Sequence, residues 1–188
     1  PSIIQFMPNR RVVITGLGML SPTGNEVESS WQNILLGKSG VKEISYFDTT
    51  DFETKFAACL HNFEPENYLE KKIIRRTDNF IQYGLIAAIQ CVNDANIKLN
   101  LVDPSRIGVS IGSGIGGLLT IETNSQILAN KGPKKISPFF VPGSIANMVS
   151  GYVSLHFGCK GPNISIASAC SSASHSIGYA YRSIVHGD

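Results

Sequence analysis

The stretch that decides the fold is NISIASACSSASHSIG, residues 163–178. Together with Pro162 before it, the stretch begins with PNISIASA, residues 162–169, which is typical of a buried strand. From Cys170 to His186 the small residues and the length indicate a helix. The strand therefore turns abruptly into a helix at Cys170. Such a turn projects its side chain at the carboxyl end of the strand, where the active sites of α/β folds gather.

Cys170 has the surroundings of a nucleophile. A helix N-terminus stabilises a thiolate through its dipole and its unpaired N–H groups, and small neighbours leave space for a substrate. A buried structural cysteine is the alternative, but the position at the turn favours the nucleophile. The other cysteines, Cys59, Cys91 and Cys159, have no C-x-x-C spacing. We expect all four to be reduced thiols.

A second pattern, GSGIGG at residues 112–117, has the dinucleotide-binding spacing G-x-G-x-x-G. That fingerprint requires an acidic residue about 20 positions later, at the end of the next strand. The corresponding region, NKGPKKISP, is basic and interrupted by proline. We therefore interpret the glycines as small residues that let another segment pack against the strand end.

Strands alternate with helices along the rest of the chain, which predicts a parallel, largely buried sheet in a layered α/β fold. The first half should contain a buried strand at 11–20, a helix within 24–40, an irregular segment at 40–62 with a short strand at 55–60, and a helix at 78–97 capped by Asp78. In the helix within 24–40, Trp31, Ile34 and Leu35 share one face and Gly37 lies near the end. A strand at 106–111, a helix at 118–129, a loop at 131–144 and a helix at 145–157 should follow.

Composition excludes several classes of protein. The 188 residues, 43% hydrophobic and 16% charged, predict one globular domain. A net charge of +2 is too small for bulk nucleic-acid binding. No run approaches the ~18 apolar residues of a membrane span, and we expect no signal peptide. We treat residues 1–6, before Met7, as an extension, and residues 7–188 as the domain.

Five motifs, in this order, carry a family resemblance: RRVVITGLGMLSPTGN, DNFIQYG, RIGVSIGSGIGGL, GPKKISPFFVP and GPNISIASACSSASHSIG. The chain resembles the N-terminal half of the β-ketoacyl-[acyl carrier protein] synthases of the thiolase superfamily, most closely their type II members. The resemblance implies one of the two similar halves of a thiolase-like, layered α/β/α fold. One departure is Ser168, where threonine is usual in the family.

The resemblance implies an acyltransferase of fatty-acid biosynthesis. Cys170 falls on the acyl-accepting cysteine, which would take a fatty acyl group as a thioester. Malonyl carrier protein would then lose carbon dioxide and attack that thioester in a Claisen condensation, lengthening the chain by two carbons. No metal or dissociable cofactor is implied.

The family's two catalytic histidines belong to its C-terminal half, and none of this chain's four histidines matches them. His175 follows Cys170 by five residues, about 140° round a helix at 100° per residue, which places it poorly to share the cysteine's site. His61, His156 and His186 are expected in loops, at helix ends or at the surface. We therefore expect the 188-residue chain alone to be inactive in condensation.

The resemblance also implies binding residues and partners. Ile115 falls at a position that lines the acyl-chain pocket, and Phe140 falls near that pocket and the subunit interface, with ordinary core packing as the alternative for Phe140. Two basic clusters match the family's contacts with the acidic carrier protein: Lys72, Arg75 and Arg76 form one, and Lys134 and Lys135 form the other. Solvated charged faces are the alternative for both clusters. A cytoplasmic homodimer is expected, and an isolated half should expose a large apolar face.

Two other functions stay open at this stage. A polyketide-type ketosynthase is compatible with the ACSS motif at residues 169–172, although SPFFVP at residues 137–142 looks more like the fatty-acid enzyme. A non-catalytic domain that binds acyl chains or a partner is the third hypothesis. Cys170 discriminates against it, because a binding domain has no need of a thiol at the turn.

Overall fold

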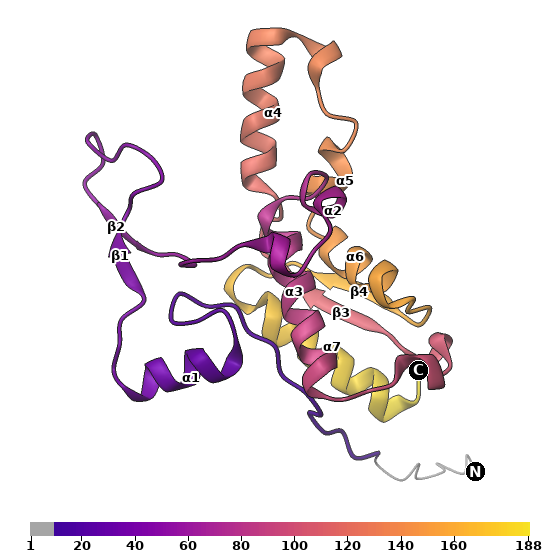
Figure 1. The fold of residues 1–188 in the computed structure, drawn as a ribbon. Coiled ribbons are helices and arrows are strands. Elements are labelled where there is room, and N and C mark those ends of the chain that lie inside the picture. Colours follow the sequence, from indigo (N-terminus) through magenta and orange to yellow (C-terminus); the bar gives the residue numbers. More distant parts are fainter. Residues whose placement is uncertain (1–9) are drawn as a thin grey trace. The chain divides into compact units, whose positions relative to one another are not determined.

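The computed structural model describes residues 10–188, which divide into two compact units (Figure 1). The described part of unit 1 is residues 10–14, 76–84 and 98–188, and unit 2 is residues 15–75 and 85–97. The extension expected at residues 1–6 lies outside the described residues.

Unit 1 contains a parallel pair of strands, β3 and β4. The pairing runs from Val109 opposite Asn163 to Gly112 opposite Ile166. Parallel neighbours need a long crossover, and here helices supply it before a last helix follows β4. The elements are β3 (Val109–Gly112), α4 (Leu118–Lys131), α5 (Phe140–Ser144), α6 (Met148–Phe157), β4 (Asn163–Ile166) and α7 (Ser172–His186).

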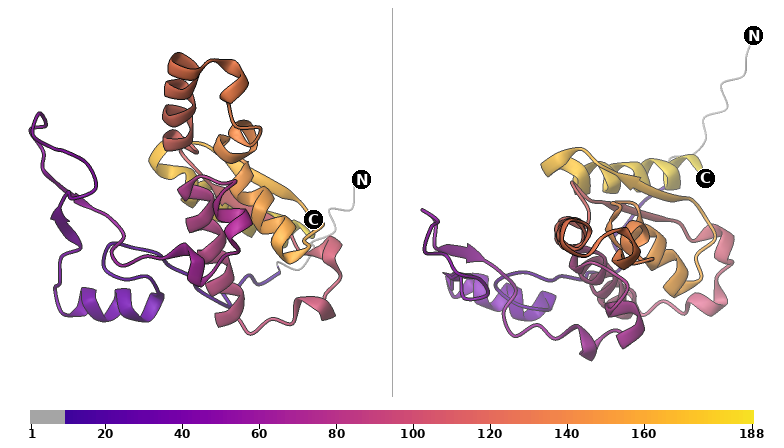
Figure 2. Two further views of the ribbon diagram at one scale, coloured as in Figure 1. Left: turned by 45° about the horizontal axis from the view of Figure 1, so that its top comes forward. Right: turned by 90° about the horizontal axis from the view of Figure 1, so that it is seen from above.

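Helices α6 and α7 both pack against the two strands of unit 1. The right-hand view of Figure 2 shows the strands between α7 on one side and α6 on the other. Val109 of β3 and the α6 residues Val149 and Val153 are buried. The layered α/β arrangement predicted from the alternation of elements is therefore present in unit 1, although β3 and β4 are mostly half-buried.

Helix α3 (Asn79–Asp94) confirms the long helix expected at 78–97. Asp78 is buried, and its Oδ1 accepts a hydrogen bond from the Phe80 N–H at 3.3 Å, as expected of a helix cap. Its Oδ2 accepts a second bond from the Thr120 N–H in α4 at 2.8 Å. One carboxylate thus satisfies backbone donors at the start of two helices.

The crossover follows its prediction only in part. Helix α4 begins at the expected Leu118, and α6 begins three residues later than expected. The segment 131–144, predicted to be a loop, contains a 3₁₀ turn, η4 (Pro133–Lys135), and the short helix α5. Proline causes the difference, because it favours the first turn of a helix while it breaks the interior.

Unit 2 contains α1 and a small antiparallel hairpin. Helix α1 (Val27–Leu35) lies within the predicted range, and Gly37 follows it at a φ of 65°. Strand β2 (Phe56–Ala58) confirms the short strand expected there. Its partner β1 (Val41–Glu43) was not expected. A second helix, α2 (Lys71–Ile74), completes the unit together with the later part of α3.

The buried strand expected at residues 11–20 is wrong. Residues 10–20 form no strand, and Ile14 is 82% exposed. The Leu17 and Met19 N–H groups donate instead to the side chains of Asp94 and Gln90 in α3, at 2.8 and 2.9 Å. A β-branched run shows only that a segment suits a sheet, whereas a strand also needs a partner strand.

Large apolar side chains are exposed in both units. In unit 2 the apolar face of α1 is open, with Trp31 54% and Leu35 61% exposed. In unit 1 Ile177 of α7 is 70% exposed. Within residues 10–188, none of the helices has the length and apolar character needed to cross a membrane.

Candidate active site

Cys170 lies in the turn between β4 and α7, residues 167–171, which we call the elbow. The elbow includes a 3₁₀ turn, η5 (Ala169–Ser171), and the Cys170 side chain is exposed. The preceding residue, Ala169, has a φ of 52°, in the left-handed region. That conformation costs an L-residue about 1–2 kcal/mol, and such strain persists where the surroundings hold it, often at functional sites.

Two serine hydroxyls hold the elbow in this conformation. Ser172 Oγ accepts from the Ser168 N–H at 2.9 Å and donates to the Ala169 carbonyl at 2.7 Å. Ser171 Oγ donates to the Ser168 carbonyl at 2.7 Å. These bonds give the backbone of a tight turn the partners that a strand or helix would supply.

Helix α7 begins directly after the elbow and is 15 residues long. The side chain of its N-cap residue, Ser171, makes no cap hydrogen bond to the helix. The first N–H groups of α7 and its dipole therefore favour negative charge beside Cys170.

His175 contacts the elbow, which its helical position relative to Cys170 did not predict. Its ring Nδ1 lies 2.6 Å from the Ser168 hydroxyl, across the elbow. The helical angle between His175 and Cys170 says nothing about Ser168, which lies before the helix. The seven-residue separation across a strand-to-helix turn has no periodic signal, so only the folded chain places the two side chains together.

The glycines at residues 112–117 adjoin the elbow and have a packing role. A Cβ on Gly112 would lie 2.3 Å from the carbonyl of Ser172, so β3 and α7 approach closely only because this residue is glycine. Gly116 has a φ of 91° and lies against Ser144 of α5. The interpretation of these glycines as small residues for close packing is confirmed.

Ile115 stands between these glycines and is 69% exposed. A Cβ on its neighbour Gly114 would lie 3.6 Å from the Ala169 carbonyl oxygen, so the glycine segment lies beside the elbow. Phe140 is half-buried at the start of α5. Because Ser144 at the other end of α5 contacts Gly116 and Gly117, these segments are neighbours in unit 1.

The basic residues predicted to bind a carrier protein have different surroundings. Lys72 in α2 and Arg75 after it are exposed in unit 2, and Lys134 and Lys135 are exposed on η4 in unit 1. Arg76 is half-buried, and its guanidinium lies 4.4 Å from the centre of the Phe139 ring. Arg76 therefore makes a cation–π contact within the fold.

The four cysteines are all free thiols, and their surroundings distinguish Cys170. Cys59, Cys91 and Cys159 are half-buried, whereas Cys170 is exposed. Burial raises the pKa of the Cys91 thiol, and the Asp94 carboxylate raises it further. Burial also raises the pKa of the Cys159 thiol. At neutral pH these two carry less thiolate than an ordinary cysteine.

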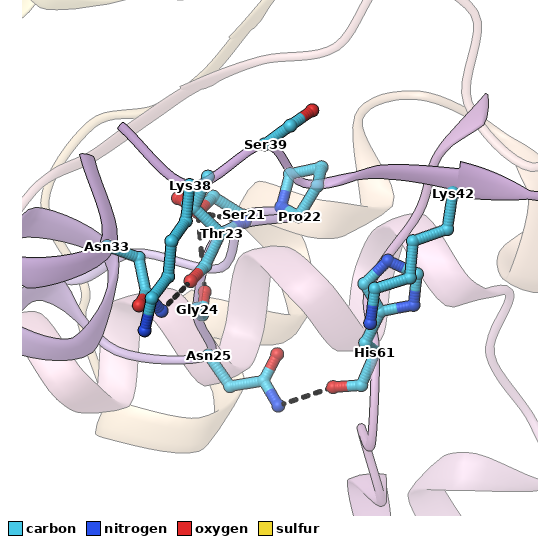
Figure 3. A pocket seen from close by; sticks show the side chains of 10 residues that line it. All are labelled: Ser21, Pro22, Thr23, Gly24, Asn25, Asn33, Lys38, Ser39, Lys42 and His61. Carbon is cyan, nitrogen blue, oxygen red and sulfur yellow. Dashed lines mark hydrogen bonds between the residues drawn. The ribbon is translucent and has the colours of Figure 1, made fainter. Parts of the chain in front are cut away.

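A pocket of about 480 Å³ lies in unit 2 (Figure 3). The Asn25 amide beside it donates to the His61 carbonyl at 3.1 Å, and the Asn33 amide donates to the Thr23 carbonyl at 2.7 Å. None of the site residues predicted from the sequence lines it. The lining residues are Ser21, Pro22, Thr23, Gly24, Asn25, Asn33, Lys38, Ser39, Lys42 and His61.

Comparison with protein families gives one match over nearly the whole chain. The model for "Beta-ketoacyl synthase, N-terminal domain" matches residues 9–188. Among solved structures, the ishigamide ketosynthase/chain length factor is similar, with a TM-score of 0.86 and 26% identity over 96% of this chain and 45% of that one.

Two bacterial relatives carry the name 3-oxoacyl-[acyl-carrier-protein] synthase 2. The protein of Vibrio cholerae serotype O1 is 53% identical over 182 residues, and that of Coxiella burnetii is 51% identical over 182 residues. In both cases the match covers 97% of this chain and 44% of the relative. The chain thus spans less than half the length of these relatives.

Proposed function

The chain belongs to the β-ketoacyl synthase family, whose N-terminal domain it matches, and on this premise we propose that the full protein is an acyltransferase of fatty-acid elongation. In it, Cys170 accepts a fatty acyl group from an acyl carrier protein. Malonyl carrier protein then loses carbon dioxide, and its carbanion attacks the acyl thioester. The product is longer by two carbons.

The observation that carries this proposal is the exposed Cys170 thiol in a strained elbow before the N-terminus of α7. In the first step the Cys170 sulfur attacks the thioester carbonyl carbon, and the carrier's thiol leaves with the proton that Cys170 gives up. In the second step a carbon–carbon bond forms and the Cys170 sulfur leaves as a thiolate. Covalent catalysis divides one difficult transfer into two easier ones.

The α7 dipole acts in both steps, because the attacking and the departing sulfur each carry negative charge. The decarboxylation step needs groups that handle the malonyl carboxylate and the developing enolate. By the family resemblance, two histidines of the C-terminal half supply them. The role proposed for the 188 residues described above is therefore acceptance and positioning of the acyl group.

The acyl chain is proposed to lie against Ile115. This is the one bulky side chain among the glycines beside the elbow, and its exposure leaves an apolar surface on that segment. Phe140 is proposed to contact the acyl chain as well, because α5 packs on the same glycine segment. The cytoplasmic homodimer stays a prediction from the resemblance.

A polyketide-type ketosynthase is the second candidate function. Its support is the similarity to the ishigamide ketosynthase/chain length factor, at 26% identity. The 53% identity to a relative named as a 3-oxoacyl-[acyl-carrier-protein] synthase favours the fatty-acid substrate.

The test of the proposal is acyl loading of the full-length protein. Incubation with a fatty acyl carrier protein should add one acyl group, which peptide mass spectrometry should locate on Cys170. Cys170→Ala should abolish the adduct, and Ile115→Phe should restrict loading to shorter acyl groups because the larger ring fills the space beside the elbow.

Cys159→Ala is the matched control, since this thiol is half-buried with a raised pKa. It should load as the unchanged protein does. Full loading of Cys170→Ala, or an adduct confined to Cys59, Cys91 or Cys159, would refute the role of Cys170.

A further inference from the structure

Ser168 and His175 form a side-chain hydrogen bond that spans the elbow. The Ser168 hydroxyl and the His175 Nδ1 are 2.6 Å apart, a short distance for such a pair. Ser168 comes directly before the strained Ala169, and His175 lies in the first turn of α7. The bond therefore joins the strand side of the elbow to the helix side.

The other bonds of the elbow are more local. The Ser171 and Ser172 hydroxyls reach partners within four residues, inside the turn itself. They shape the turn, and the Ser168–Ser172 bond joins it to the first residue of α7. The Ser168–His175 bond reaches seven residues along the chain and adds a side-chain link further into the helix.

We propose that Ser168 and His175 are positioning residues, which hold the elbow so that the Cys170 sulfur stays beside the N-terminus of α7. The inference rests on the proposed role of Cys170 as the acyl acceptor. Neither residue is a catalytic residue in this account, because each acts through the backbone that carries Cys170. A small displacement of a reacting group from its productive geometry slows a reaction strongly.

The geometry allows the bond in both protonation states of the histidine. When Nδ1 carries no proton, the Ser168 hydroxyl donates to it, and when Nδ1 is protonated, in the other neutral tautomer or in the charged ring, Nδ1–H donates to the Ser168 oxygen. The proposal therefore predicts that the reactivity of Cys170 depends on the Ser168 hydroxyl and on the His175 ring. A substitution that restores the bond should restore that reactivity.

The experiment uses the full-length protein with two readouts. One is the rate of acyl loading onto Cys170 from a fatty acyl carrier protein. The other is the rate of Cys170 alkylation by iodoacetamide, which needs no carrier protein. Ser168→Ala and His175→Ala should each slow loading about tenfold, the loss expected from one positioning hydrogen bond. Both variants should also slow the alkylation of Cys170.

Three comparisons separate positioning from a general loss of structure. Ser168→Thr keeps the hydroxyl and should restore both rates. Ser174→Ala, an exposed serine on the same helix, should leave them unchanged. The double variant Ser168→Ala/His175→Ala should be no slower than the slower single variant, because both changes remove one bond.

Rates unchanged in both alanine variants, additive losses in the double variant, or a Ser168→Thr variant as slow as Ser168→Ala would each overturn the proposal. If either single variant fails to fold, the other tests the same bond from its opposite end. If the unchanged protein accepts no acyl group, the proposed function fails, while the alkylation rates still test the Ser168–His175 bond.

Discussion

At the scale of single residues, the position of Cys170 depends on the backbone at two residues that have a small side chain or none. Ala169 adopts a left-handed conformation, and Gly112 lets β3 approach the first turn of α7. A Cβ at Gly112 would meet backbone atoms of Ser172 and Ala173 within 2.3–2.7 Å. Backbone atoms cannot move aside as a flexible side chain does, so the elbow would have to shift.

Gly112→Ala is therefore expected to lower the free energy of unfolding by about 1–3 kcal/mol, as overpacking does in well-packed interiors, and to slow Cys170 alkylation. Gly178→Ala is the control, because a Cβ there has no neighbour within 4 Å. It should be neutral or stabilise α7 by up to about 1 kcal/mol. Denaturant unfolding measures both, and an unchanged midpoint for Gly112→Ala would contradict the packing argument.

At the scale of elements, unit 1 depends on how helices begin. Asp78 accepts from the Phe80 N–H at the start of α3 and from the Thr120 N–H of α4. The carboxylate is buried, and both hydrogen bonds are partly shielded from water. Asp78 therefore stabilises the first turns of both α3 and α4, next to the end of the glycine segment at residues 112–117.

Removal of the Asp78 carboxylate should lower the free energy of unfolding by more than the removal of an ordinary helix cap does. Asp78→Ala is expected to lower the free energy of unfolding by about 2–3 kcal/mol, because a single cap contributes about 1 kcal/mol and a buried donor left unpaired adds to the loss. Asp78→Asn keeps one acceptor oxygen and should lose less. Asp51→Ala, an exposed control in unit 2, should change stability by under about 0.5 kcal/mol. A loss of the same size at Asp51 and Asp78 would remove the capping explanation.

At the scale of the whole molecule, the chain is two units with separate basic clusters. Lys72 and Arg75 belong to unit 2, and Lys134 and Lys135 belong to unit 1. All four are exposed and free to contact an acidic partner. Arg76 differs, since its stacking on Phe139 gives it a part in the fold. A charge reversal at Arg76 would change stability and binding together.

We expect Lys72→Glu/Arg75→Glu and Lys134→Glu/Lys135→Glu to weaken binding of the acyl carrier protein about tenfold each at low ionic strength, because opposite charges speed association. The effect should shrink as salt screens exposed charges. Lys98→Glu, an exposed lysine outside both clusters, should bind normally. A calorimetric titration measures these affinities, and a double reversal that binds with unchanged affinity would show that its cluster is a solvated face.

The sequence alone was enough for the features that depend on local backbone preferences. Four features were predicted in this way: helix α1 with the glycine after it, the Asp78 cap of α3, strand β4 and the turn at Cys170. They could be predicted because propensities, caps and turns involve residues near one another in the chain. The order of motifs also indicated the family. These signals locate the nucleophile candidate without a structure.

Only the tertiary structure decided contacts between residues that no local pattern relates. Residues 11–20 have the composition of a strand but bond to side chains of α3, since a strand depends on its partner. Arg76 stacks on Phe139, and Ser168 meets His175 across the elbow. The physical reason is common to all three: backbone preference is local, whereas a hydrogen bond or a ring contact requires two groups that only the folded chain brings within reach.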